Sequence, residues 1–120
     1  MCINIDPKET EKFKSKKGEV KVWKVLSYLG NKEYCTPYKR VLVESGMVLS
    51  NAVPFTSVNY VVRGEGVHAF VDRKHAMWSD AAYSTSWPVL VECTANMDDF
   101  IAVGIHGDIA FTKLTIGELP

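Results

Sequence analysis

The chain has 120 residues, of which 47% are hydrophobic and 23% charged, and 14 Lys and Arg balance 14 Asp and Glu. This length fits one domain with its own core, and this composition excludes a disordered chain. A net charge of zero argues against a general nucleic-acid binder, which needs a basic field. No stretch of the sequence approaches eighteen consecutive apolar residues, so we expect no segment that spans a membrane.

The neutral total hides an asymmetry between the two halves of the chain. Residues 1–60 hold ten Lys and Arg against six Asp and Glu (+4), and residues 61–120 hold four against eight (−4). Opposite charges of this kind favour pairing of subunits through polar surfaces. Several large aromatic residues also exceed what a small monomer can bury. Both features predict a homodimer or a higher oligomer.

The three cysteines Cys2, Cys35 and Cys93 are widely spaced and form no CxxC pair. A zinc ribbon or a thioredoxin-like site is therefore not indicated. Residues 1–7 lack the basic region and apolar run of a signal peptide. We expect a cytoplasmic protein with reduced thiols.

The first 19 residues are polar and rich in lysine, and only Phe13 offers an anchor for burial. They are predicted to form an exposed polar arm or frayed turn, followed by one domain over residues 20–120. Within that domain, β-branched and aromatic runs bounded by Gly, Asn and Asp predict strands. These runs are Val20–Leu26, Tyr60–Val62, Val67–Val71, Pro88–Thr94, Phe100–Val103 and Ile109–Ile116, with a short extended segment at Arg40–Glu44.

One helix is predicted over residues 73–83, with Asp72 as its N-cap. Residues 50–59 are predicted to form a loop, and its length is typical of functional loops. The order of strands, one helix and further strands predicts an α+β fold, in which one helix packs on a mainly antiparallel β-sheet. We expect Val67–Val71, Pro88–Thr94 and Ile109–Ile116 at the centre of the sheet.

The histidines are the first candidates for chemistry. His68 lies in a predicted strand, His106 lies in a turn beside Asp108, and His75 lies on the exposed face of the predicted helix. Their separation does not match a zinc site, and no serine stands in a nucleophile elbow. We therefore predict no catalytic set, no metal and no cofactor.

The segment from Arg63 to Gly66 carries two glycines just before the strand of His68. It lacks the third glycine of a dinucleotide fingerprint and precedes a strand rather than a helix, so it is no Rossmann signature. Gly66 permits close approach of another backbone or of a ligand. Exposed backbone amides beside Arg63 favour a phosphate contact.

A ligand site follows from these residues. We predict that Arg63, His68 and Lys113 approach one pocket, with Trp23 or Tyr60 as an aromatic wall. Arg63 offers paired hydrogen bonds to a phosphate, Lys113 adds a point charge, and an aromatic ring stacks on a base. The alternative is that Arg63 and Lys113 point to solvent on opposite faces.

Four segments together resemble a group of small, mostly uncharacterised bacteriophage proteins. These segments are Met1–Ile3, Val22–Leu26 followed by Thr36–Tyr38, Gly66–Phe70 with a helix after it, and Gly107–Ile116. The resemblance implies a viral origin and a small α+β fold, and it brings no catalytic residues with it. By analogy, small early phage proteins often counter host defence by binding a protein, or by sequestering or degrading a nucleotide signal.

Three functions are therefore weighed for the chain. The first is a non-catalytic binder that sequesters a small anionic, nucleotide-like signal in the host cytoplasm. The second is an inhibitor that acts through its surface on a host defence protein. The third is a nucleotide-cleaving enzyme that uses His68 or His106. A pocket with arginine and aromatics favours the first, a flat surface the second, and a deep polar pocket around His68 the third.

Overall fold

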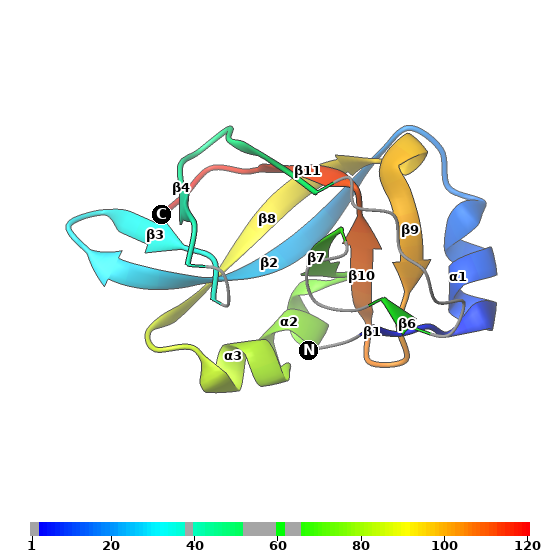
Figure 1. The fold of residues 1–120 in the computed structure, drawn as a ribbon, viewed down its shortest axis with the longest axis horizontal. Helices are drawn as coiled ribbons and strands as arrows, with labels where there is room; N and C mark the ends of the chain where they lie inside the picture. Colours follow the sequence, from blue (N-terminus) through cyan, green and yellow to red (C-terminus); the bar gives the residue numbers. More distant parts are fainter. Residues whose placement is uncertain (1–2, 38–39, 52–59, 62–65) are drawn as a thin grey trace.

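The computed structural model describes residues 3–37, 40–51, 60–61 and 66–120, with the backbone alone described at 60 and 61. Its longest strand, β2 (Glu19–Gly30), confirms and extends the first predicted strand. β2 pairs antiparallel with β8 (Pro88–Asn96) along the full length of β8. β-Branched and aromatic side chains favour this extended backbone. The two strands form the long central pair of the sheet (Figure 1).

The sheet is antiparallel at each pairing that the structure describes, which confirms a mainly antiparallel α+β domain. The order across the sheet is β5 (Val48–Ser50), β11 (Lys113–Ile116), β8, β2, β7 (Val67–Phe70), β10 (Asp108–Phe111) and β9 (Phe100–Val103). The three strands expected at the centre lie inside the sheet, but its middle strand is β2. Apolar residues on both faces of β2 explain its place, since a strand covered on both sides reads as a continuous apolar run.

The predicted strand Ile109–Ile116 is broken at Thr112 into β10 and β11. Thr112 donates its N–H to the Asp99 carbonyl and accepts from the Asn51 N–H, each at 2.8 Å, so its bonds go to loops rather than to the sheet. Three strands, β8, β2 and β7, lie between β11 and β10. In a flat sheet, β11 and β10 would therefore be about 19 Å apart. Because one residue joins the two strands, the sheet must curl around its core.

The predicted helix over 73–83 forms two short helices, α2 (Arg73–Met77) and α3 (Asp80–Ser84). Asp72 caps α2 as predicted, accepting from the His75 N–H at 2.8 Å. A second cap, Ser79, accepts from the Ala82 N–H at 3.2 Å and starts α3. The break follows because the Ser79 side chain competes with the backbone for hydrogen bonds.

Both short helices cover one face of the sheet. Ala76 of α2 and Ala81 of α3 are buried against Val25 of β2. Small side chains at these two positions let the helices approach the strand closely. Figure 1 shows α2 and α3 together beside β2 and β7.

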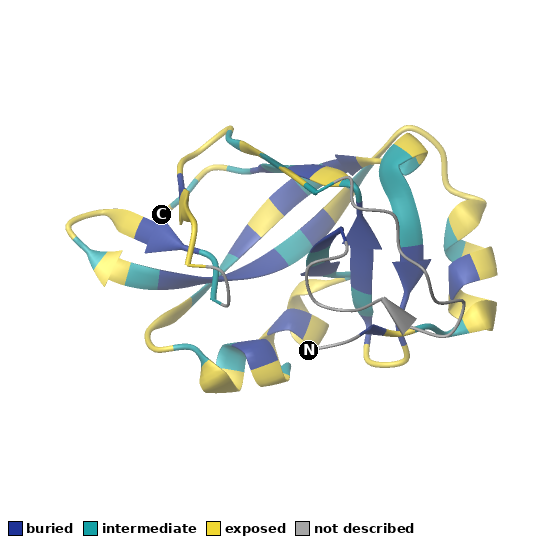
Figure 2. Ribbon diagram, viewed as in Figure 1, coloured by how far each residue is buried: buried dark blue, intermediate teal, exposed yellow. Residues whose placement is uncertain are grey.

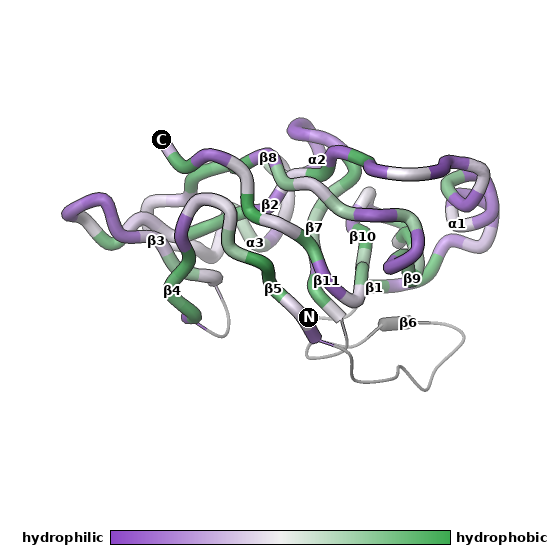
Figure 3. Tube along the Cα trace, turned by 90° about the horizontal axis from the view of Figure 1, so that it is seen from above, coloured by the Kyte–Doolittle hydropathy of each residue, from purple (hydrophilic) through white to green (hydrophobic). Residues whose placement is uncertain are grey.

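Residues 7–14, predicted within an exposed polar arm, form the helix α1 (Pro7–Lys14). Figure 3 shows its hydrophilic character, which explains the prediction. Asp6 caps α1, accepting from the N–H groups of its first turn. Thr10 is buried, and its hydroxyl oxygen lies 3.1 Å from both the N–H and the carbonyl oxygen of Val103 in β9. Phe13 stacks on Phe100 with ring centroids 5.2 Å apart.

Short elements complete the chain. They are β3 (Glu33–Cys35), β4 (Leu42–Val43), the 3₁₀ turn η1 (Met97–Asp99), and β1 (Ile3–Asn4) with its partner strand β6 (Tyr60–Val61). Of the predicted loop 50–59, residues 52–59 lie outside the described residues. In the part of the chain that the structure covers, no helix is long and apolar enough to cross a bilayer.

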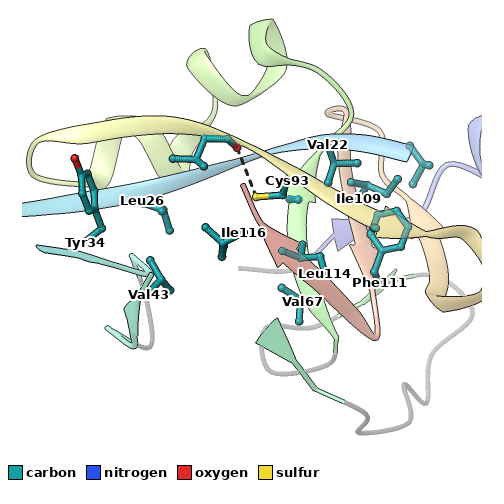
Figure 4. Packing of buried hydrophobic residues seen from close by; sticks show 14 residues of the cluster. Val22, Leu26, Tyr34, Val43, Val67, Cys93, Ile109, Phe111, Leu114 and Ile116 are labelled. Carbon is teal, nitrogen blue, oxygen red and sulfur yellow. Dashed lines mark hydrogen bonds between the residues drawn. The ribbon is translucent and has the colours of Figure 1, made fainter. Parts of the chain in front are cut away.

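One principal core fills the curl of the sheet (Figures 2 and 4). Its buried residues come from strands far apart in sequence. The largest fully buried side chains among them are Val22, Leu26, Cys93, Ile109, Phe111, Leu114 and Ile116. A smaller cluster around Ile3 lies under the N-terminal segment, and a third lies under α2 and α3.

Candidate functional site

The structure distributes the predicted ligand residues over several elements. Arg63 lies outside the described residues. Tyr60 is in β6, where its backbone pairs with Asn4, and its side chain is not described. The remaining three, Trp23, His68 and Lys113, belong to β2, β7 and β11.

Trp23 lies opposite Phe70 where β2 meets β7. It is half-buried and packs with Leu90 against the alanines of α2 and α3. Its ring therefore fills the space between sheet and helices. This packing accounts for Trp23 without an aromatic wall for a ligand.

Lys113 is exposed and lies at the level of Ser50 on β5. The strand register aligns Thr115 of β11 with Thr94 of β8, and Thr94 with Lys21 of β2. Lys113 therefore lies two strands away from Trp23 and four residues away from it along the strand direction. Strand spacing makes this separation roughly 16 Å. The structure does not bring Lys113 and Trp23 to one pocket.

The predicted opening at Gly66 is occupied by protein. Gly66 has a φ of +73°, which favours glycine, and a side-chain carbon at this position would lie 2.9 Å from the Phe111 carbonyl oxygen. The close approach permitted by the glycine is therefore made by the backbone of β10. His68, two residues further, is half-buried on β7 opposite Ala110.

Lys24 is a candidate that the sequence analysis passed over. Alternation along β2 places it on the face of Val22 and Leu26, which are both fully buried, and only 9% of Lys24 itself is exposed. A lysine at a core position is unusual, because burying an ammonium costs free energy unless partners compensate it. The signal in the sequence was a lysine within a run that is apolar on both faces.

The Lys24 ammonium donates to the His68 carbonyl oxygen over a distance of 2.7 Å. β2 and β7 share the single register pair Trp23–Phe70, and Lys24 follows Trp23 directly on β2. Burial raises the pKa of the nearby Cys93 thiol, and the positive charge of Lys24 partly opposes that rise. The charge of Lys24 is thus felt in the core.

A second cluster joins α2 to the turn before β10. His75 Nδ1 lies 2.7 Å from Asp72 Oδ1, and the His75 N–H lowers the pKa of the Asp72 carboxyl. The His75 ring lies against Gly107, where an added side-chain carbon would collide with it. This contact explains why the turn needs glycine, and the helix cap accounts for the Asp72–His75 pair without chemistry.

Asp108 lies next to this cluster and is partly buried. Burial raises the pKa of its carboxyl, and hydrogen bonds and the charges of His106 and His75 partly oppose the rise. Among the described residues, Asp108 Oδ1 has no hydrogen-bond partner. Within the same residues, no group of three His, Cys, Asp or Glu side chains suits a metal ion.

Among the described residues, the most exposed large apolar side chains include Trp78, Tyr83 and Trp87, and together with Met77 they form what we call the aromatic surface. Trp78 is 69% exposed, Tyr83 81% and Trp87 75%. An open hollow of about 450 Å³ lies among these helices and the start of β8. The side chains that line it are Met77, Trp78, Ala82, Tyr83, Thr85 and Pro88, and none of these is basic.

Trp87 is held by its backbone at the edge of this region. Its φ is +54°, a left-handed conformation that costs a bulky residue about 1–2 kcal/mol. The Trp87 carbonyl accepts from the Tyr28 N–H at 3.0 Å, and the Ser27 hydroxyl donates to the Ser86 carbonyl at 2.7 Å. These bonds to β2 stabilise the conformation, and the indole remains in solvent.

No family profile, curated protein or solved structure matches this chain. Function is therefore argued from Lys24 and from the aromatic surface.

Proposed function

We propose that the chain is a non-catalytic binding protein that sequesters a small anionic, nucleotide-like ligand and releases it uncleaved. Lys24 carries the proposal. Its ammonium is a positive charge held inside the sheet, where the dielectric constant is lower than in water and an anion is attracted more strongly. Burying an ammonium costs free energy unless partners compensate it, so a lysine at a core position favours a role in function over one in packing.

His68 is the described neighbour of Lys24, and Arg63 lies outside the described residues. The half-buried His68 follows Arg63 by five positions, and Arg63 remains the predicted bidentate contact to a phosphate. In this proposal Lys24 takes the role first given to Lys113, which lies on a distant part of the sheet. The resemblance to phage proteins suggests that the ligand is a host defence signal in the cytoplasm of the infected cell.

The test is uptake from a panel of cyclic and linear nucleotides, followed by denaturation and mass analysis of what is released. We expect intact ligand. Lys24→Met should weaken uptake at least tenfold, about 1.4 kcal/mol, in a variant that circular dichroism shows to be folded.

Lys21→Met is the matched control, since Lys21 lies on the same strand, is exposed and donates a hydrogen bond to Thr94. It should bind like wild type. A cleaved product would indicate an enzyme. Absence of uptake across the panel, or equal losses in both variants, would contradict the proposal.

A second candidate is an inhibitor that acts on a host protein through its surface. The exposed Trp78 and Tyr83 favour it, because tryptophan and tyrosine dominate binding hot spots. A plaque assay on a defence-bearing host separates the two candidates. Loss of protection with Lys24→Met supports sequestration, whereas loss with Tyr83→Ala alone supports the inhibitor.

A further inference from the structure

We infer that the aromatic surface is a two-fold interface between two copies of this chain. The inference is independent of the ligand proposed for Lys24. It rests on the exposed area of the surface, on the charges at its two ends and on the way Trp87 is held.

The exposed area reaches the minimum that a specific dimer needs. Trp78, Tyr83 and Trp87 are each more than two-thirds exposed, and such side chains present on the order of 500 Å² together. An isologous interface uses the same surface twice, so two copies would bury about 1,000 Å². That total reaches the lower range of specific interfaces. An apolar surface without basic groups in its hollow also suits a second copy of itself better than an anion.

The charges beside the aromatic surface are self-complementary. Lys74 lies four residues before Trp78 on α2, and Asp80 lies three residues before Tyr83 on α3, so each charge neighbours one aromatic ring. Both are exposed, and neither forms an ion pair with another described residue. In the inferred dimer, a two-fold axis between the two rings pairs Lys74 of each copy with Asp80 of the other.

Trp87 adds a structural cost that an interface would explain. Its left-handed backbone is maintained by bonds from β2, and the next residue, Pro88, lines the hollow. Strained residues that persist in a fold cluster at functional sites. Because the backbone of Trp87 is already fixed, it loses little conformational freedom when a second copy covers the indole.

Sedimentation equilibrium of the full chain between about 1 and 100 µM, roughly the range in which small interfaces dissociate, tests the inference. Wild type should approach twice the 13.4 kDa chain mass. Tyr83→Ala should raise the dimer dissociation constant at least tenfold, and so should Lys74→Glu or Asp80→Lys. Lys113→Glu, on a strand away from α2 and α3, should dimerise like wild type.

Charge exchange distinguishes a second copy from any other partner. An equimolar mixture of Lys74→Glu and Asp80→Lys chains should recover a dimer. Positions 74 and 80 are both negative in the first chain and both positive in the second, so the two chains attract each other. The double variant should recover a homodimer. Circular dichroism confirms that each variant is folded. A monomeric wild type at the highest concentration, dimers that ignore these changes, or a mixture that stays monomeric would each overturn the inference.

Discussion

The two helical regions of the molecule contrast in how their composition relates to their burial. α1 is hydrophilic, yet Thr10 and Phe13 fasten it to β9. α2 and α3 carry large aromatics, yet they bury only their alanines and leave Trp78 and Tyr83 in solvent. One hydroxyl and one ring are enough to dock a polar helix, whereas aromatic content does not by itself bury a helix. The partners available in the fold decide which side chains are covered.

The largest effect should come from the anchor of α1. Phe13→Ala removes the stack on Phe100 and an apolar contact with the main core. We expect a loss of about 2–3 kcal/mol in the free energy of unfolding, less than for a fully buried ring because Phe13 is half-buried. Urea denaturation measures it. Lys12→Ala, exposed on the same helix, is the control and should change stability by under about 0.5 kcal/mol. Equal effects of the two changes would mean that α1 is not docked through its ring.

A smaller effect should come from Asp108, which lies under the N-terminal segment. Its carboxyl oxygen is close to Ile3 and Gly104, and burial raises its pKa above the ordinary value of 3.8. The charged form therefore destabilises the fold above the folded-state pKa, and this cost disappears as the pH falls below 3.8. Asp108→Asn should raise the melting temperature at neutral pH, and the difference from wild type should vanish in acid.

Thermal melts of both chains from pH 3 to 8, an interval spanning roughly the carboxyl titration range, measure this dependence. Asp98→Asn, an exposed carboxylate in η1, serves as the control and should show no such trend. An advantage of Asp108→Asn that grows toward acid would refute the sign assigned here.

The smallest effect on folding should come from the aromatic surface. Tyr83 is 81% exposed, so Tyr83→Ala should change the unfolding free energy of the monomer by less than about 0.5 kcal/mol. Urea denaturation well below the dimer dissociation constant measures the monomer alone. A loss comparable to that of Phe13→Ala would mean that the ring stabilises the fold and that the contrast between the two regions is wrong.

The candidate site was harder to predict than the fold. His68 was recognised by its place beside Gly66, but the space that Gly66 allows is filled by the Phe111 carbonyl. Lys24 was overlooked because a lysine in a strand ordinarily points to solvent. Its burial depends on which face of β2 lies inside the curled sheet, and no local pattern encodes that.

The sequence by itself determined the elements with local causes. β-Branched runs produced the strands, Asp72 started α2, and the single α+β domain with a mainly antiparallel sheet followed from the order of these runs. Tertiary structure decided the rest. The bend at Thr112 depends on hydrogen bonds to Asp99 and Asn51, and α1 is held by a hydroxyl bonded to Val103, 93 residues away. Such bonds join distant segments, so their effect exists only once the sheet has closed around its core.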